Sequence, residues 1–345
     1  MTLMLLDSAS LWYRAYYGMP DTLLAPDGTP VNAIRGYLDM TARLIGMYSP
    51  NRIVACIEGD WRPSWRVDIF PDYKANRSEP PEELVPQFAL VREATAALTL
   101  PAVELAGFEA DDMIAIWTQE HPDDEHIIVS TDSDFYQLIA PNVTQYNGTT
   151  DELVSLEGFK SVKTGEWVID KKTKDVKTPI DPEFALFEKC VRGDSSDNIF
   201  SAYPGARKKG SKNKTGIMEA FEDRNTGGFN YNNFMLQRWT DHNEEEHRVR
   251  DDFMRNKILI DLTEQPDAMA MRLFSSNAKM MSGNPSTNLG INGLDYNQVQ
   301  VTLRNPNQGS GVARLFIYPP GSTTDTCYYT FQVDTSMTSF STYTI

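Results

Sequence analysis

Acidic residues gather in two short motifs of this chain, Glu109-Ala-Asp111-Asp112 and Asp132-Ser-Asp134. Five carboxylates held within a few ångströms of one another repel by several kcal/mol at a low effective dielectric constant. Such a group is tolerated where cations, usually Mg²⁺, neutralise it. The motifs therefore predict a hydrolytic site that holds more than one metal ion.

The elements that would position these acids follow from hydrophobic patterning. Thr2–Leu6, Arg52–Ile57 and His126–Ser130 are short apolar runs that predict strands. Asn32–Met47 and Glu83–Leu98 keep the apolar spacing of helices. Alternating strands and helices predict an α/β fold with a mostly parallel central sheet flanked by helices.

Each predicted strand runs directly into an acid. Asp7 follows the first strand, Glu58 the second, and Asp132 and Asp134 the third. Ligands of open α/β sheets bind at the carboxyl ends of strands, which is where these acids fall. Any one of them, taken alone, is more simply a helix N-cap or a solvated loop residue. Agreement among separate segments favours a shared site.

A further acidic pair lies in Gly193-Asp194-Ser-Ser-Asp197-Asn198, a pattern that is also ordinary turn chemistry. With this pair the chain resembles the 5′-nuclease family, which includes phage 5′–3′ exonucleases, flap endonucleases and the 5′-nuclease domain of bacterial DNA polymerase I. The resemblance covers roughly residues 2–265. It rests on the order of Asp7…Arg14, Tyr73-Lys74-Ala-Asn-Arg77, Glu109-Ala-Asp111-Asp112, Asp132-Ser-Asp134 and Asp194-Ser-Ser-Asp197.

The resemblance implies a PIN-like or resolvase-like catalytic fold and two groups of metal ligands. The first group would be Asp7, Glu109, Asp111, Asp112 and Asp132, and the second Asp134, Asp194 and Asp197. Glu58 departs from the pattern, because the family has Asp after the second strand. Either Glu58 reaches the metal, through a water if necessary, or Asp60 compensates; Glu58 is favoured because it directly ends the apolar run.

The implied chemistry uses two divalent ions about 4 Å apart, Mg²⁺ or Mn²⁺, and no side-chain nucleophile. The resemblance also implies that Lys74 polarises the scissile phosphate and that Arg14 and Arg77 contact substrate. His242 and His247 invite a metal interpretation, but the glutamates at 244–246 between them favour a solvated helix.

Basic residues suggest where a polyanionic substrate would lie. Arg62, Arg66 and Lys74 share a stretch with Trp61, Trp65, Phe70 and Tyr73, so phosphate contacts and base stacking could be combined there. The alternative is a cationic loop whose rings are simply core. By resemblance, this stretch leads into the mobile arch that receives a 5′ single strand.

A second basic region runs from Pro204 to Gly216 and contains Arg207, Lys208, Lys209, Lys212 and Lys214. Its glycines permit close backbone approach to phosphate, and a helix is expected at Ile217–Phe221. The resemblance implies a helix–three-turn–helix that holds duplex DNA with a K⁺ ion, although the loop is longer than the compact family pattern. Lys160–Lys177 predicts a β-hairpin, either solvated or in contact with DNA.

Composition limits the remaining possibilities. The chain has 345 residues and a net charge of −16, but its basic residues are clustered, so nucleic acid stays a plausible partner. Three scattered cysteines and the absence of a signal-like start or a long apolar run predict a cytoplasmic protein without a membrane segment.

The expected organisation is a catalytic domain with a helical arch over residues 1–180, a DNA-binding region over 181–275 and a β-rich module over 282–345. The β module is expected from stretches at Gln298–Leu303, Ala313–Tyr318 and Cys327–Val333. Two functions are open: a structure-specific 5′–3′ exonuclease or flap endonuclease acting on DNA ends, nicks, flaps and RNA primers, or a DNA-structure-binding protein that retains the fold without cleaving. Nothing in the sequence predicts the oligomeric state.

Overall fold

The computed structural model describes residues 1–59, 62–98, 100–212 and 214–265, together with four strands at 300–303, 312–317, 327–332 and 341–344. The chain divides into two compact units. The first comprises residues 1–266 and 279–283, and the second the remaining residues. All residues of the site considered below belong to the first unit.

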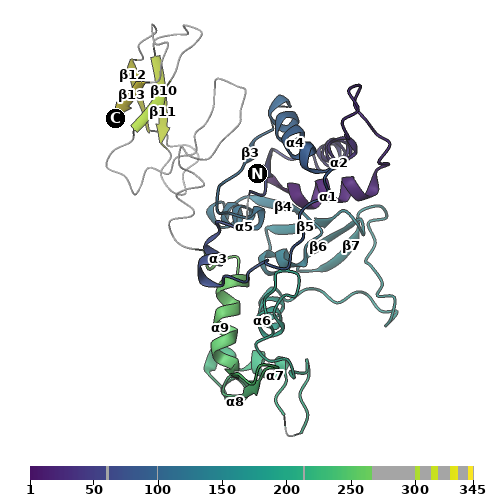
Figure 1. Ribbon diagram of the computed structural model, residues 1–345, viewed down its shortest axis with the longest axis vertical. Coiled ribbons are helices and arrows are strands. Elements are labelled where there is room, and N and C mark those ends of the chain that lie inside the picture. Colours follow the sequence, from purple (N-terminus) through teal and green to yellow (C-terminus); the bar gives the residue numbers. More distant parts are fainter. Residues whose placement is uncertain are drawn as a thin grey trace. The chain divides into compact units, whose positions relative to one another are not determined.

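A seven-stranded sheet of order β3-β2-β1-β4-β5-β6-β7 forms the centre of the first unit (Figure 1). The five strands from β3 to β5 are parallel, and β6 and β7 continue the sheet in antiparallel fashion. The strands are β1 (Thr2–Asp7), β2 (Arg52–Cys56), β3 (Ala102–Val103), β4 (Glu125–Val129), β5 (Val143–Asn147), β6 (Glu152–Ser155) and β7 (Gly158–Ser161). The predicted mostly parallel sheet is confirmed.

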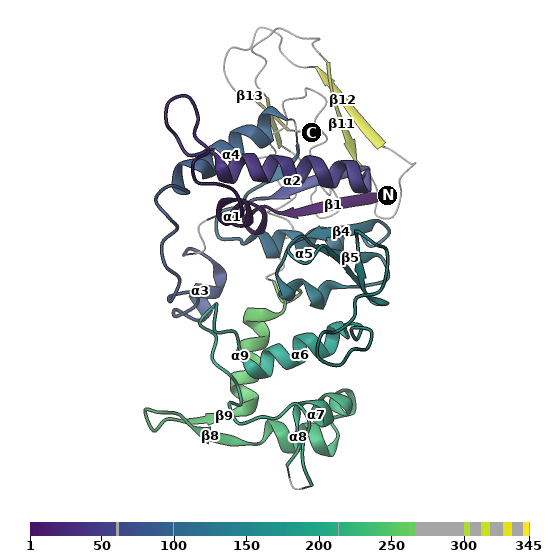
Figure 2. The same ribbon diagram turned by 90° about the vertical axis from the view of Figure 1, so that its right-hand side faces the viewer.

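Helices cover both faces of this sheet (Figure 2). Side chains alternate between the two faces along a strand, so Met4 and Leu6 of β1 share one face. There they join a core with Trp12, Tyr37 and Val91 from α1 (Ser8–Gly18), α2 (Asn32–Tyr48) and α4 (Val85–Ala97). The opposite face of β1 packs against α5 (Ala110–Glu120). The short helices α3 (Trp65–Ile69) and η1 (Ser133–Leu138) complete the part of the unit built around the sheet.

A second core holds the helical part of the unit together, with Phe187, Ile217, Phe234 and Phe253 among its buried members. It is built by α6 (Pro182–Arg192), α7 (Ile217–Glu222), α8 (Phe229–Met235) and α9 (Val249–Ile260). The short helix η2 (Arg224–Thr226) joins α7 to α8, and β8 (Arg238–Thr240) pairs with β9 (Glu246–Arg248). These helices lie together below the sheet in Figure 1.

Most of the expected elements occur, and one does not. The helix expected at residues 244–246 is wrong: Glu244 has a φ of +67° and lies in the turn between β8 and β9. The hairpin expected within Lys160–Lys177 is confirmed by bridges from Lys160 to Trp167 and from Ile169 to Val176.

Four strands are described in the second unit, and each of the three expected β-prone stretches overlaps one of them. β10 (Gln300–Leu303) pairs with β13 (Ser341–Thr344), and β11 (Val312–Ile317) pairs with β12 (Cys327–Gln332), both in antiparallel fashion. Among the described residues, no helix is both long and apolar enough to span a membrane.

Candidate metal-dependent nuclease site

A cleft of about 820 Å³ opens at the carboxyl ends of the parallel strands. Parallel strands that end at the same edge bring distant parts of the chain together there. Five of the expected acids line this cleft: Asp7, Glu58, Glu109, Asp111 and Asp132. They come from the ends of β1 and β2, from the start of α5 and from the loop after β4.

A small pocket adjoins the cleft and shares Glu109 and Asp111 with it. The other acids that line this pocket are Asp134, Asp194 and Asp197. The carboxylates thus form two neighbouring groups with a common border. This division follows the two groups of ligands that the family resemblance implied, with Asp112 as the exception.

Asp112 is a structural residue. Its side chain is fully buried and both of its oxygens accept hydrogen bonds from the Arg66 guanidinium, at 2.9 and 2.7 Å. Oδ2 also accepts a bond from the backbone N–H of Glu109, which caps α5. The structure does not support the expectation that Asp112 binds metal, because this side chain lines neither the cleft nor the adjoining pocket.

Arg66 and Tyr73 were expected to touch DNA, and their burial excludes this. Each side chain is 2% exposed. Arg66 also donates from Nε to the carbonyl of Leu259 on α9, and the Tyr73 hydroxyl donates to Glu109 at 3.1 Å. Tyr73 is a buried member of the second core and Phe70 packs against that core, so the core interpretation applies to these two rings. Asp60 and Trp61 lie outside the described residues.

Two of the acids also cap helices, as the simpler interpretation expected. Asp7 accepts a hydrogen bond from the backbone of Ser10 at 3.1 Å, and Ser130 donates to its other oxygen at 2.6 Å. Asp132 accepts from the backbone of Asp134 at 2.9 Å. Capping fixes the direction of these carboxylates, and both still line the cleft.

Lys74 and Arg77 stand at the border between the two groups of acids. The buried Lys74 ammonium bonds to Glu109 and lies 4.0 Å from Asp197. Arg77 donates to Asp197 at 2.7 Å and approaches Glu58 to 3.9 Å. Lys74 has a φ of +56°, and its N–H bonds to the carbonyl of Asp197 at 2.9 Å. The segment is therefore tied directly to the loop that carries the second group.

Lys189 is a site residue that the sequence interpretation missed. From the last turn of α6, its ammonium bonds to Asp134 and lies 2.8 Å from Asp194. Its position a few residues before the Gly193-Asp194 motif is the only signal that the sequence offers for it.

The energetics of the acids indicate that cations belong here. Burial raises the pKa of Asp7 to about 6 and that of Glu58 to about 7. Burial raises the pKa of Asp134 to about 7 as well. The Oε1 atom of Glu109 is buried and makes no hydrogen bond to any residue that the structure describes. A buried carboxylate oxygen without a partner, amid acids that resist ionisation, suits a divalent cation.

Comparison with known proteins agrees with this geometry. Residues 2–167 match the model of the 5′-3′ exonuclease N-terminal resolvase-like domain. A 5′-3′ exonuclease of Streptomyces coelicolor is 37% identical over 233 residues, which cover 64% of this chain and 72% of the relative. This chain belongs to the 5′-3′ exonuclease family.

One further relative and one solved structure extend the comparison for this exonuclease family member. A DNA polymerase I of Rhizobium leguminosarum is 33% identical over 65% of this chain, which spans 21% of the polymerase. The fold also matches a bacteriophage T5 flap endonuclease crystallised with DNA and metal ions, at a TM-score of 0.53 and 20% identity. That match covers 81% of this chain and 95% of the phage protein.

The open side of the cleft in this exonuclease family member carries groups that a phosphate backbone can contact. Arg14 lines the cleft beside Tyr13, Tyr17 and Thr149. Tyr17 is 73% exposed, which leaves its ring available to a ligand. Sequence reasoning did not select the two tyrosines or the threonine, because none of them belongs to a recognisable motif. Among the described residues, no histidine lines the cleft.

The second basic region of this exonuclease family member forms a closed loop before α7. Glu219 of α7 accepts hydrogen bonds from the backbone N–H groups of Gly210 and Gly216, each at 3.0 Å. A Cβ on Gly210 would lie 2.3 Å from the carbonyl of Lys214, so the loop closes only with glycine there. Arg207, Lys208, Lys209, Lys212 and Lys214 are exposed on this loop.

Proposed function

We propose that this nuclease hydrolyses phosphodiester bonds near the 5′ ends of DNA, as a 5′–3′ exonuclease and flap endonuclease that uses two divalent metal ions. The observation that carries the proposal is the pair of adjoining carboxylate groups that share Glu109 and Asp111. An arrangement of two metal sites with common ligands is the one that phosphodiesterases use for in-line displacement.

The acids in this proposal have distinct positions. Asp7, Glu58, Glu109, Asp111 and Asp132 would hold the first ion, and Asp134, Asp194 and Asp197 the second, with Mg²⁺ the expected ion and Mn²⁺ a substitute. When bound, the two ions supply an activated water and stabilise the leaving oxygen. All of these ligands are oxygen atoms, which Mg²⁺ and Mn²⁺ prefer.

The remaining charged side chains would orient the scissile phosphate. Burial alone would lower the pKa of Lys74, but the Glu109 carboxylate raises it above its usual value, so Lys74 stays cationic. Lys74 and Arg77 border both groups of acids, and Arg14 lines the same cleft. Three cations around a phosphate neutralise charge and fix its position for attack.

Glu58 supports the first site in spite of its extra methylene group. It lines the same cleft as Asp7 and Asp132, and Arg77 lies 3.9 Å from its carboxylate. A longer side chain that starts from the same strand end can contact an ion through one bound water. We therefore assign Glu58 to the first site, as a direct ligand or through one bound water.

The region from residue 181 onward would hold duplex DNA. The exposed lysines of the loop before α7 can neutralise phosphates, and the glycines allow the backbone to approach them closely. This proposal includes the helix–three-turn–helix and its K⁺ ion. The proposed substrates are nicked or flapped DNA and RNA primers paired with DNA. The proposed role is in DNA replication in the cytoplasm. The overall fold match to a flap endonuclease supports the arrangement.

Cleavage of three 5′-labelled substrates, with and without Mg²⁺, tests the proposal: a flap, a blunt duplex and an RNA–DNA hybrid. We expect short 5′ products from the flap, and loss of these products in chelator and in the Asp132→Ala variant. The matched control is Asp123→Ala, since Asp123 is exposed and precedes β4, at the end of the strand opposite Asp132.

Cleavage by Asp132→Ala at the wild-type rate, or cleavage that continues in chelator, would overturn the metal-dependent mechanism. Tight binding of the flap without any cleavage by the wild-type protein would instead support a DNA-structure-binding protein. Release of products from the hybrid decides whether RNA primers belong among the substrates.

A further inference from the structure

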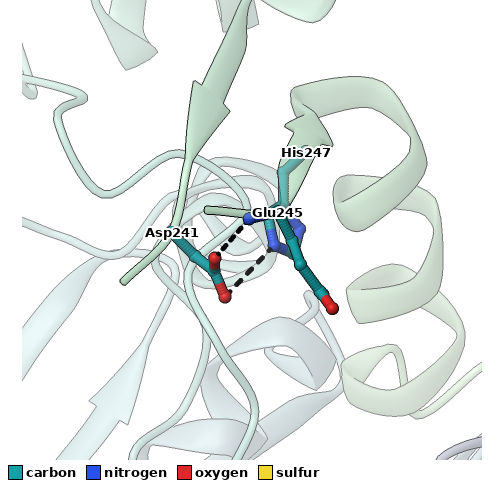
Figure 3. Close-up of side chains that lie close together, drawn as sticks. All are labelled: Asp241, Glu245 and His247. Carbon is teal, nitrogen blue, oxygen red and sulfur yellow. Dashed lines mark hydrogen bonds and ion pairs between the residues drawn. The ribbon is translucent and has the colours of Figure 1, made fainter. Parts of the chain in front are cut away.

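A second group of metal-ligating residues lies far along the chain from the cleft, in the hairpin of β8 and β9. The strands pair with Trp239 opposite His247, and the turn between them spans residues 241–245. Asp241 organises this turn, because its Oδ1 accepts hydrogen bonds from the backbone N–H groups of Asn243 and Glu245 at 2.9 and 2.8 Å. Oδ2 of Asp241 is turned towards His247 (Figure 3).

Three potential ligands meet at this turn (Figure 3). One carboxylate oxygen each from Asp241 and Glu245 and one ring nitrogen of His247 lie within 4.8 Å of one another. The distance from Oδ2 of Asp241 to Nε2 of His247 is 3.8 Å. Ligands of a tetrahedral ion with bonds of about 2.0–2.1 Å are roughly 3.3 Å apart, so the three ligand atoms would move closer together when an ion binds.

The ring of His247 is held in the orientation that a metal ligand needs. Its Nδ1 lies 3.1 Å from Oδ2 of Asp252 on α9, and the ring stacks on Trp239 at 4.3 Å with planes 13° apart. Asp252 is in turn fixed by Arg255 at 2.9 Å. When a carboxylate accepts the Nδ1–H, the lone pair that can bind a metal is on Nε2. A carboxylate is a usual hydrogen-bond acceptor for the other ring nitrogen of a metal-bound histidine.

Nε2 of His247 has no hydrogen-bond partner among the described residues. The atom is buried, and buried polar atoms are normally satisfied by protein, water or an ion. Together, the oriented ring, the unsatisfied nitrogen and the two adjacent carboxylates distinguish this turn from an acidic surface loop.

We propose that Asp241, Glu245 and His247 bind a divalent transition-metal ion of the Zn²⁺ type, which braces the β8–β9 hairpin against α9. One imidazole and two carboxylates suit Zn²⁺ better than Mg²⁺, which prefers oxygen ligands alone. Three protein ligands leave a fourth position for water. The proposal does not depend on the nuclease mechanism, because it uses other residues and another class of ion.

Zn²⁺ titration of the full chain by calorimetry tests this site, with millimolar Mg²⁺ present to occupy the carboxylate groups of the cleft. We expect a binding event that is weakened at least about tenfold in His247→Gln, since a ligand nitrogen is lost. The matched control is His242→Gln, because His242 is exposed in the same turn and lies outside the cluster. The control should bind Zn²⁺ as the wild type does.

A second variant keeps the test decisive if His247→Gln fails to fold. Glu245 is exposed and its backbone, not its side chain, takes part in the turn, so Glu245→Gln should fold normally and still bind Zn²⁺ more weakly. Equal Zn²⁺ affinity in wild type and in the folded variants would overturn the proposal.

Trp239 provides an independent optical test, because its ring stacks on the proposed ligand. Co²⁺ bound at the site should quench the part of the wild-type fluorescence that is absent from a Trp239→Phe variant. His247→Gln should lose this quenching, whereas His242→Gln should keep it. Quenching of equal size in His247→Gln would show that Co²⁺ binds elsewhere and would contradict the site.

Discussion

At the scale of residues, neighbouring acids in one motif have opposite tasks. Successive side chains on a helix are rotated by about 100°, so Asp111 and Asp112 at the start of α5 cannot face the same way. Asp111 lines the cleft, while Asp112 points inward to Arg66. Arg66 also donates to the carbonyl of Leu259, so the Arg66–Asp112 pair links α5 to α9.

Replacing Arg66 by Met should destabilise the protein by roughly 3–5 kcal/mol, because it leaves the fully buried Asp112 carboxylate without its partner. Urea unfolding would measure this loss. Arg62→Met is the matched control: Arg62 is 56% exposed and pairs with the exposed Glu79, so a change of about 0–1 kcal/mol is expected. If Arg66→Met were as stable as Arg62→Met but bound DNA poorly, the structural role assigned to Arg66 would be wrong.

The same residues show what sequence alone could predict at this scale. The acids that the cleft brings together follow strand ends or open a helix, and those positions can be recognised from local patterns. The tasks of Arg66, Tyr73, Asp112 and Lys189 depend on which distant group each one meets. Arg66 meets Leu259, 193 positions away, and no local pattern encodes that pairing.

At the scale of elements, different residues supply the positive charge of the loop before α7 and fix its conformation. Its lysines supply positive charge, whereas Glu219 and the two glycines hold the loop closed. The helix that follows the loop was expected at Ile217–Phe221 and occurs as α7. The closure of the loop could not be predicted, because it depends on an acid of that helix reaching back to two backbone N–H groups.

Two sets of variants should therefore weaken DNA binding in different ways. Replacing Lys209, Lys212 and Lys214 by Ala should reduce affinity and flatten its salt dependence, by up to about 0.9 in the log–log slope for each phosphate that is no longer neutralised. Glu219→Ala should reduce affinity with little change of slope, because the positive charges remain while the loop opens. Fluorescence anisotropy of a labelled flap at several salt concentrations measures both quantities. Equal slopes in the two sets would contradict direct neutralisation of phosphates by the lysines.

At the scale of the whole molecule, every residue assigned to the cleft, the adjoining pocket and the basic loop lies in the first compact unit. That unit contains two cores of its own, and domains with their own cores fold independently. The β-rich stretches at 300–344 could be expected from composition, but their role could not, because they carry none of the motifs that the site uses.

A chain that ends at Gly283 retains the whole of the first unit, so it should fold and cleave a flap within about twofold of the full-length rate. A chain that ends at Arg248 makes the matched comparison, because it removes α9. Without α9, Arg66 loses the Leu259 carbonyl, and Asn256 no longer donates to the carbonyls of Cys190 and Phe200. This shorter chain should lose cooperative unfolding and cleavage together. Loss of cleavage in the chain ending at Gly283, with its thermal unfolding unchanged, would instead assign the second unit a direct part in handling DNA.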